Sequence, residues 1–108
     1  MMLYVKVLSL SVSASSSGDT YWAPERDVKI YKILVTERSS TDLDNVFCKI
    51  SKADIPLTKE AIPLSILNVS WNAAPPFELT LEKGVKLKFE VTNNLTSDIS
   101  LDFLIFYE

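Results

Sequence analysis

Apolar and polar residues alternate along most of this chain, which is the pattern of a β-strand with one buried face. The clearest stretch covers residues 77–92, where apolar residues occupy every second position on both sides of Lys83-Gly84. No segment of helical length shows an apolar stripe with a period of 3.6 residues. Further strands are expected over residues 28–36, 46–51 and 99–107.

The Lys83-Gly84 turn has two interpretations. If the strands around it form a hairpin, pairing Leu81 with Val85 places every apolar residue on one face and sets Glu78 opposite Lys88. Gly84 would then supply the positive φ that a three-residue hairpin loop needs. In the other interpretation, the turn connects the two sheets of a sandwich. The alternation is compatible with both.

In two other segments, residues 1–14 and 62–71, the apolar positions change phase midway. A phase change moves the apolar side chains to the opposite face, so it indicates a β-bulge or a strand that bends into a second sheet. Counting each bent strand twice gives seven to nine short strands. We therefore predict one all-β domain over residues 1–108, a two-layer antiparallel β-sandwich that is jelly-roll or immunoglobulin-like.

Composition excludes several classes of protein. A chain of 108 residues with 47% hydrophobic residues is long enough to bury a core without a disulfide or a metal. Its formal net charge of −3 has the wrong sign for a nucleic-acid-binding domain. No apolar run approaches the roughly 18 residues of a membrane span.

The start of the chain has one feature of a signal peptide, because Val12-Ser13-Ala14 ends like a cleavage site. Lys6 interrupts the apolar run, however, so we expect residues 1–14 to form a strand and leave the localisation open.

The chain lacks the residue types that common catalytic and cofactor-binding sites require. The chain contains no histidine, so Ser-His-Asp and Cys-His mechanisms are excluded. A single cysteine, Cys48, cannot build a zinc site and is expected in the core. The only glycines are Gly18 and Gly84, which do not form a phosphate-binding loop. We therefore expect neither an enzyme nor a bound cofactor.

One loop carries oxygen ligands of the kind that calcium prefers. Asp42, Asp44 and Asn45 are closely spaced in a predicted loop. No glycine or bidentate glutamate follows at the spacing of a calcium loop. A solvated turn that begins the next strand is the preferred interpretation, and a calcium site stays open.

Two pairs of residues are candidates for recognition. Tyr21 and Trp22 lie in the longest predicted loop, residues 13–26, where aromatic side chains serve as sugar-stacking platforms or interface anchors. Alternatively, Trp22 folds back and fills an open end of the sandwich. In the last strand, Leu104 and Phe106 make the outer face apolar, so a loop of the same chain or another subunit must cover it.

The C-terminal third of the chain resembles the second half of small jelly-roll coat or decoration proteins of phages and archaeal viruses. The resemblance rests on Leu81, Gly84, Val85, Leu87, Phe89, Val91, Asn93-Asn94 and the closing Tyr107-Glu108. It implies a protein that assembles with copies of itself or with other structural subunits. The chain lacks a basic arm for packaged nucleic acid, which favours an outer or minor virion component.

The leading hypothesis is thus a structural assembly protein whose contacts involve Tyr21, Trp22, Leu104 and Phe106. The alternative is a carbohydrate-binding or adhesion module in which the aromatic loop with Tyr21 and Trp22 contacts a glycan.

Overall fold

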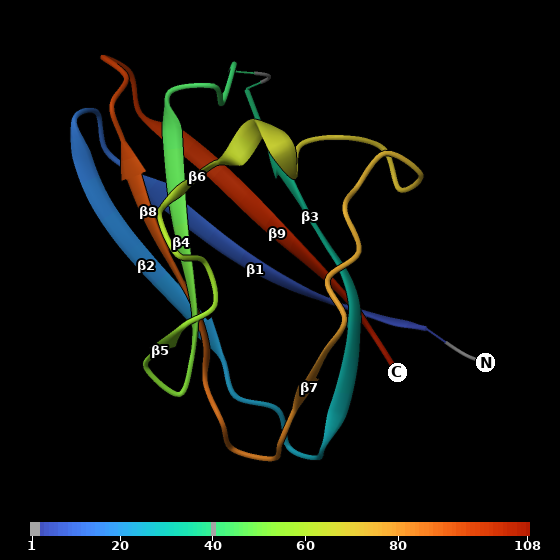
Figure 1. The fold of residues 1–108 in the computed structure, drawn as a ribbon. Coiled ribbons are helices and arrows are strands. Elements are labelled where there is room, and N and C mark those ends of the chain that lie inside the picture. Colours follow the sequence, from blue (N-terminus) through green and yellow to red (C-terminus); the bar gives the residue numbers. More distant parts are fainter. Residues whose placement is uncertain (1–2, 40) are drawn as a thin grey trace.

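A computed structural model describes residues 3–39 and 41–108 as two antiparallel sheets packed face to face (Figure 1). The first sheet has the order β1 (Tyr4–Val12), β9 (Ile99–Tyr107), β3 (Val28–Glu37) and β7 (Leu79–Leu81). The second has the order β2 (Ser16–Trp22), β8 (Leu87–Asn93), β4 (Val46–Lys52) and β5 (Ile55–Pro56), and β6 (Ile62–Pro63) also pairs with β4. A short 3-10 helix, η1 (Leu64–Ile66), follows β6. The predicted two-layer β-sandwich is confirmed.

The strand order separates the two predicted topologies. β1 pairs with β9 along its whole length, from Tyr4 opposite Tyr107 to Val12 opposite Ile99. The long strands and β7 alternate between the sheets: β1, β3, β7 and β9 lie in one, and β2, β4 and β8 lie in the other. The short strands β5 and β6 stay in the second sheet and pair with β4. An immunoglobulin-like domain instead pairs its first two strands within one sheet. The strand order is therefore that of a jelly roll.

The core lies between the two sheets, where the inward-facing residues of the long strands meet. Phe89 of β8 stacks on Phe103 of β9, with ring centroids 4.5 Å apart and both side chains fully buried. Burying a side chain of this size contributes about 1.5–3 kcal/mol. Cys48 is also fully buried, as predicted, and this burial, together with the nearby charge of Glu90, raises the pKa of its thiol to about 12.

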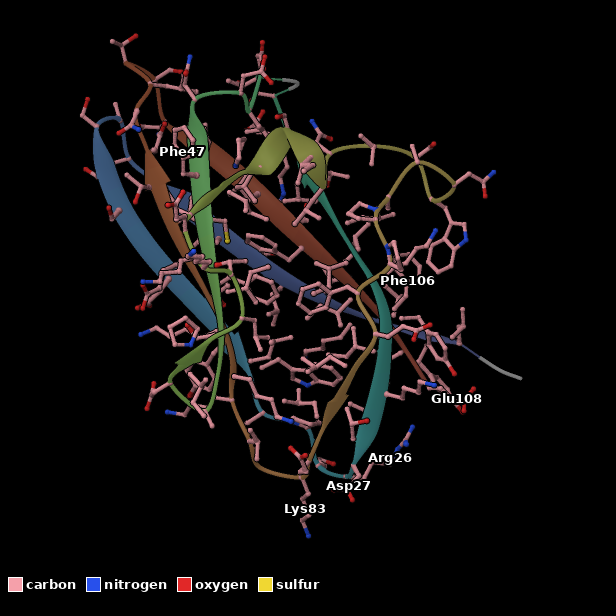
Figure 2. The ribbon with its side chains drawn as sticks, viewed as in Figure 1. Arg26, Asp27, Phe47, Lys83, Phe106 and Glu108 are labelled. Atoms are coloured by element: carbon pink, nitrogen blue, oxygen red, sulfur yellow. The ribbon has the colours of Figure 1, made fainter. Side chains whose placement is uncertain are left out.

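The Lys83-Gly84 turn connects the two sheets, so the hairpin interpretation is wrong. β7 pairs with β3, whereas β8 pairs with β2 and β4. The Val85 N–H donates to the Glu82 carbonyl oxygen at 3.0 Å, and Gly84 has φ +77°, as the third position of a type II turn requires. The neighbouring β2–β3 loop holds this turn, because the Lys83 N–H donates to Asp27 Oδ1 at 2.8 Å (Figure 2).

The predicted phase change in the first strand does not produce a bulge. β1 keeps one continuous register with β9, and its two faces are both apolar instead. Leu8 and Val12 are buried, while Val5 and Val7 point outward with 50% and 47% of their surface exposed. The irregularity in this sheet lies in β3, between Ile30 and Lys32. Met1 and Met2, which the predicted strand also included, lie outside the described residues.

The predicted strand over residues 62–71 is also wrong. Only Ile62–Pro63 pairs with β4, because the proline has no N–H to extend the ladder. The 3-10 helix that follows buries Leu64, and Leu67 is buried just after it. This segment therefore closes the edge of the core instead of bending into a second strand.

The predicted loop over residues 13–26 contains a strand, β2. Its inward positions hold Gly18, Thr20 and Trp22, so the apolar alternation that marks the other strands is missing. A Cβ atom on Gly18 would lie 3.4 Å from Val12 Cγ2, so the small residue lets β2 lie close to β1. The strand forms by pairing with β8 from Ser16 opposite Asn93 to Trp22 opposite Leu87.

Asn93 ties the two sheets together at one end of the sandwich. Its side chain is fully buried at the end of β8. The Asn93 Nδ2 donates to the carbonyl oxygens of Val12, Ser13 and Ser97 at 3.0–3.3 Å, and its Oδ1 accepts from the Leu95 N–H at 3.0 Å. One side chain thus satisfies backbone groups from β1, from the β1–β2 turn and from the β8–β9 loop.

We predict that Asn93→Ala lowers the free energy of unfolding by about 1–3 kcal/mol, because it leaves buried carbonyl oxygens without a donor. Asn93→Asp should cost more, since a carboxylate oxygen would face those carbonyls. Thermal unfolding followed by circular dichroism checks both, with about 4 °C or more expected per kcal/mol. Equal stability of the two variants would contradict a donor role for Nδ2.

Glu37 forms a second buried polar anchor, at the end of β3. Its Oε1 accepts from the N–H groups of Ser39 and Thr41 at 2.7 and 2.9 Å, and its Oε2 accepts from the Ser100 N–H at 2.9 Å. Burial by itself would raise the pKa of this carboxyl group, but the three backbone donors lower the pKa below its ordinary value. The ionised form is therefore the one that the fold stabilises.

A carboxyl group with a lowered folded-state pKa stabilises the protein above its unfolded-state pKa, and this contribution is lost as the pH falls through the folded-state value. We expect Glu37→Gln to lower the free energy of unfolding by about 1–3 kcal/mol at pH 7. The difference between the two proteins should shrink below about pH 4.3. Urea unfolding of both proteins at pH 7 and pH 3 measures this difference in the free energy of unfolding. A pH-independent difference would show that the carboxylate charge contributes nothing.

Candidate functional site

Tyr21 and Trp22 point to opposite faces of β2, so they do not form the single aromatic platform that the sequence suggested. The Trp22 ring is partly buried and packs against the core. Tyr21 is 53% exposed, and the Lys86 Nζ lies 4.6 Å from the centroid of its ring. Both residues belong to a strand and not to the predicted loop. Trp22 lines a hollow of the surface.

That hollow, which we call the aromatic hollow, lies at the end of the sandwich where β2 leads into the β2–β3 loop. Its volume is about 580 Å³, and it is lined by Lys6, Trp22, Ala23, Pro24, Glu25, Arg26, Val28 and Tyr107. The ring centroids of Trp22 and Tyr107 lie 4.9 Å apart at an interplanar angle of 55°, so the two rings pack against each other in a tilted arrangement. Tyr4 continues the cluster, 5.6 Å from Tyr107.

Two cations line the aromatic hollow. The Arg26 guanidinium carbon lies 5.9 Å from the ring centroid of Tyr4 and 6.0 Å from that of Tyr107. Lys6 is partly buried on the inward face of β1. Within the described residues, neither cation has a carboxylate oxygen within 4.0 Å, whereas Arg38 pairs with Asp102 at 2.9 Å. The hollow therefore combines aromatic faces with two cations and the carboxylate of Glu25, which forms an ion pair with neither of them.

A second surface lies on the outer side of the first sheet. We call it the apolar outer face, and it consists of Leu3, Val5, Val7, Trp71, Leu104 and Phe106. The pairing of β1 with β9 places Val5 opposite Phe106 and Val7 opposite Leu104. The predicted outer residues of β9 thus belong to a larger patch, which extends onto β1.

A loop of the same chain covers part of the apolar outer face. The Trp71 ring packs edge-on against Phe106, with centroids 4.8 Å apart, and Figure 2 shows Phe106 beside the loop that precedes β7. The Lys32 Nζ donates to the Trp71 carbonyl oxygen at 2.5 Å and lies 4.6 Å from its ring centroid. Trp71, which ended a predicted strand, is therefore not a core residue.

This cover is incomplete. Leu3, Val5 and Val7 remain exposed. Leu3 and Val5 also border an apolar depression of about 310 Å³, together with Tyr4, Trp71 and Phe106. The sequence contained the signal for these β1 residues, because Leu3, Val5 and Val7 alternate at the start of the chain. The phase change after Val7 instead indicated a β-bulge or a strand that bends into a second sheet.

The outer face becomes polar toward the other end of β9. The guanidinium of Arg38 donates two hydrogen bonds to the Asp102 carboxylate, at 3.1 and 2.9 Å, and the Ser9 Oγ donates to the same carboxylate at 2.7 Å. The bond from Arg38 is the main reason that the pKa of Asp102 lies below its ordinary value. The face therefore has an apolar half and a charged, hydrogen-bonded half.

The Asp42–Asn45 segment forms a turn before β4. Asp42 Oδ1 accepts a hydrogen bond from the Asp44 N–H at 2.9 Å, so one of the proposed calcium ligands is engaged within the turn. In residues 3–39 and 41–108, no three or more His, Cys, Asp or Glu side chains lie close enough to share a metal ion. Nor does a helix in this part of the chain have the length and apolarity needed to cross a membrane.

Comparison with known proteins adds little to this geometry. No protein-family model matches the chain, and no curated protein matches it. Among solved structures, it is similar to dimeric latent PorU from Porphyromonas gingivalis, with 10% sequence identity and a TM-score of 0.33. The match covers 100% of this chain and 13% of that one. A similarity at this level supports no conclusion about function.

Proposed function

We propose that this protein is a non-catalytic assembly module that associates with a second copy of itself through the apolar outer face. The observation that carries the proposal is the exposure of Val5 and Val7, each about half exposed next to Phe106 and Leu104 on a regular sheet. Soluble monomers rarely leave contiguous apolar patches of this kind open to water, and such patches mark contact sites.

A second copy suits this surface because of how charge is distributed on it. In a two-fold symmetric contact, each patch meets the same patch of its partner. The six residues of the apolar outer face carry no charge, so the apolar centre of the contact would bring no like charges together. The polar half of the sheet, with Arg38 and Asp102, would form a hydrated rim around an apolar centre, which is the usual anatomy of an interface.

The size of the patch predicts the strength of the contact. The six residues of the apolar outer face are fewer than the roughly 20–30 residues that each partner contributes to a stable interface. A stable interface buries about 800 Å² on each partner. We therefore expect a reversible dimer with a dissociation constant on the order of micromolar, instead of a permanent one.

The wider role as a virion component rests on the resemblance of the C-terminal third alone. Jelly rolls occur both in viral capsid proteins and in lectins. The fold is therefore compatible with the assembly hypothesis and with the carbohydrate-binding alternative, and it does not choose between them.

The test is sedimentation equilibrium over a wide range of concentrations. The unmodified protein should shift from 12.1 kDa toward about twice that mass, and the double variant Val5→Thr/Val7→Lys should raise the dissociation constant at least about tenfold. Val5 and Val7 are preferred as mutation sites because they are about half exposed and so contribute less to the fold. Leu104 and Phe106 are more deeply buried.

The control is Ile55→Lys, which adds the same charge at a 67% exposed position of the second sheet. It should leave the association unchanged. Thermal unfolding of all variants shows whether each one folds. A 12.1 kDa monomer at every concentration, or equal association by the folded double variant, would refute the proposal.

A further inference from the structure

We infer that the aromatic hollow is a binding site for an acidic saccharide, whose carboxylate lies between Lys6 and Arg26 and whose ring packs on Trp22 and Tyr107. This site lies on the inward side of β1, whereas the apolar outer face uses the outward side. The inference is therefore independent of the proposed association.

The shape of the hollow suits a sugar ring. Trp22 and Tyr107 both line the hollow, and their rings are inclined to each other at 55°. The C–H face of a pyranose is flat and apolar, and aromatic side chains offer a large rigid surface to such a group. A volume of about 580 Å³ lies within the usual range for small-molecule sites and accommodates about one or two sugar rings.

The charges of the hollow select a carboxylate. Lys6 is partly buried and has no described carboxylate oxygen within 4.0 Å, so its ammonium group is available to pair with an anionic ligand. The Arg26 guanidinium can bind a carboxylate through two parallel hydrogen bonds. Glu25 also lines the hollow, and its carboxylate can accept hydrogen bonds from sugar hydroxyl groups. An acidic peptide would supply the carboxylates but no ring with hydroxyl groups for Glu25.

Lys6 has a second physical explanation. β1 is an edge strand, and an inward-pointing charge on an edge strand discourages pairing with other chains. That role requires only the charge of Lys6. It predicts no ligand and no contribution from Arg26 or Trp22, so a binding experiment distinguishes the two explanations.

The test is a titration of the full chain with digalacturonate, followed by tryptophan fluorescence. Trp71→Phe removes the other tryptophan, so that Trp22 alone reports on the hollow. We expect a saturable change with a dissociation constant on the order of 1 mM or below. Neutral cellobiose should bind at least about tenfold more weakly, and added salt should weaken the binding of digalacturonate.

Lys6→Gln and Arg26→Gln should each weaken the binding of digalacturonate about tenfold. Lys49→Gln is the matched control, since Lys49 is also a partly buried lysine of a strand but does not line the hollow. Val5→Thr/Val7→Lys should bind as the unmodified protein does. Circular dichroism confirms that each variant is folded.

Three results would overturn the inference. The first is the absence of any change with digalacturonate at tens of millimolar, well above the expected dissociation constant. The second is equal binding of digalacturonate and cellobiose, which would exclude a role for the carboxylate. The third is binding of a tetraglutamate peptide but not of digalacturonate, which would assign the cationic hollow to acidic peptides instead.

Discussion

The stacking of Phe89 on Phe103 joins the two sheets at their centre, and the rest of the structure depends on it. One ring comes from β8 and the other from β9, so the contact exists only when both sheets are formed. Neither sheet can bury its apolar side without the other. The first sheet itself requires pairing between β1 and β9, which lie at opposite ends of the described chain. Most native contacts are therefore distant in sequence, and folding is expected to be slow for a domain of this size.

Strands were predictable from the sequence where burial imposes an alternation. The long strands β3, β4, β8 and β9 each place apolar residues at inward positions, and all four were located to within a few residues. The jelly-roll topology was not predictable, because the Lys83-Gly84 turn fits a hairpin and a crossover between sheets equally well. Contacts from the β2–β3 loop, such as Asp27 with Lys83, accompany the crossover, and they are not local in sequence.

In the candidate sites, too, the local residue types were predictable from the sequence, whereas the arrangement of these residues depends on contacts that are distant in sequence. The apolar character of Leu104 and Phe106 was visible in the sequence, but the size of their patch depends on the register between β9 and β1. The expected aromatic loop with Tyr21 and Trp22 is instead part of β2, and neighbouring residues of a strand face opposite sides. Lys6 and Arg26 are 20 positions apart in the chain, and only the fold brings them to one hollow.

The pairing of the first strand with the last also determines how the domain would respond to tension. The Tyr4 end of β1 lies beside the Tyr107 end of β9, and the two ends are close together in Figure 1. A pulling force applied at these two points would act across the ladder and not along it. The hydrogen bonds between β1 and β9 would then break one after another, as in the opening of a zipper, instead of resisting together. Held by these ends, the domain would yield at low force, although the same domain is firmly closed by its core when no load is applied.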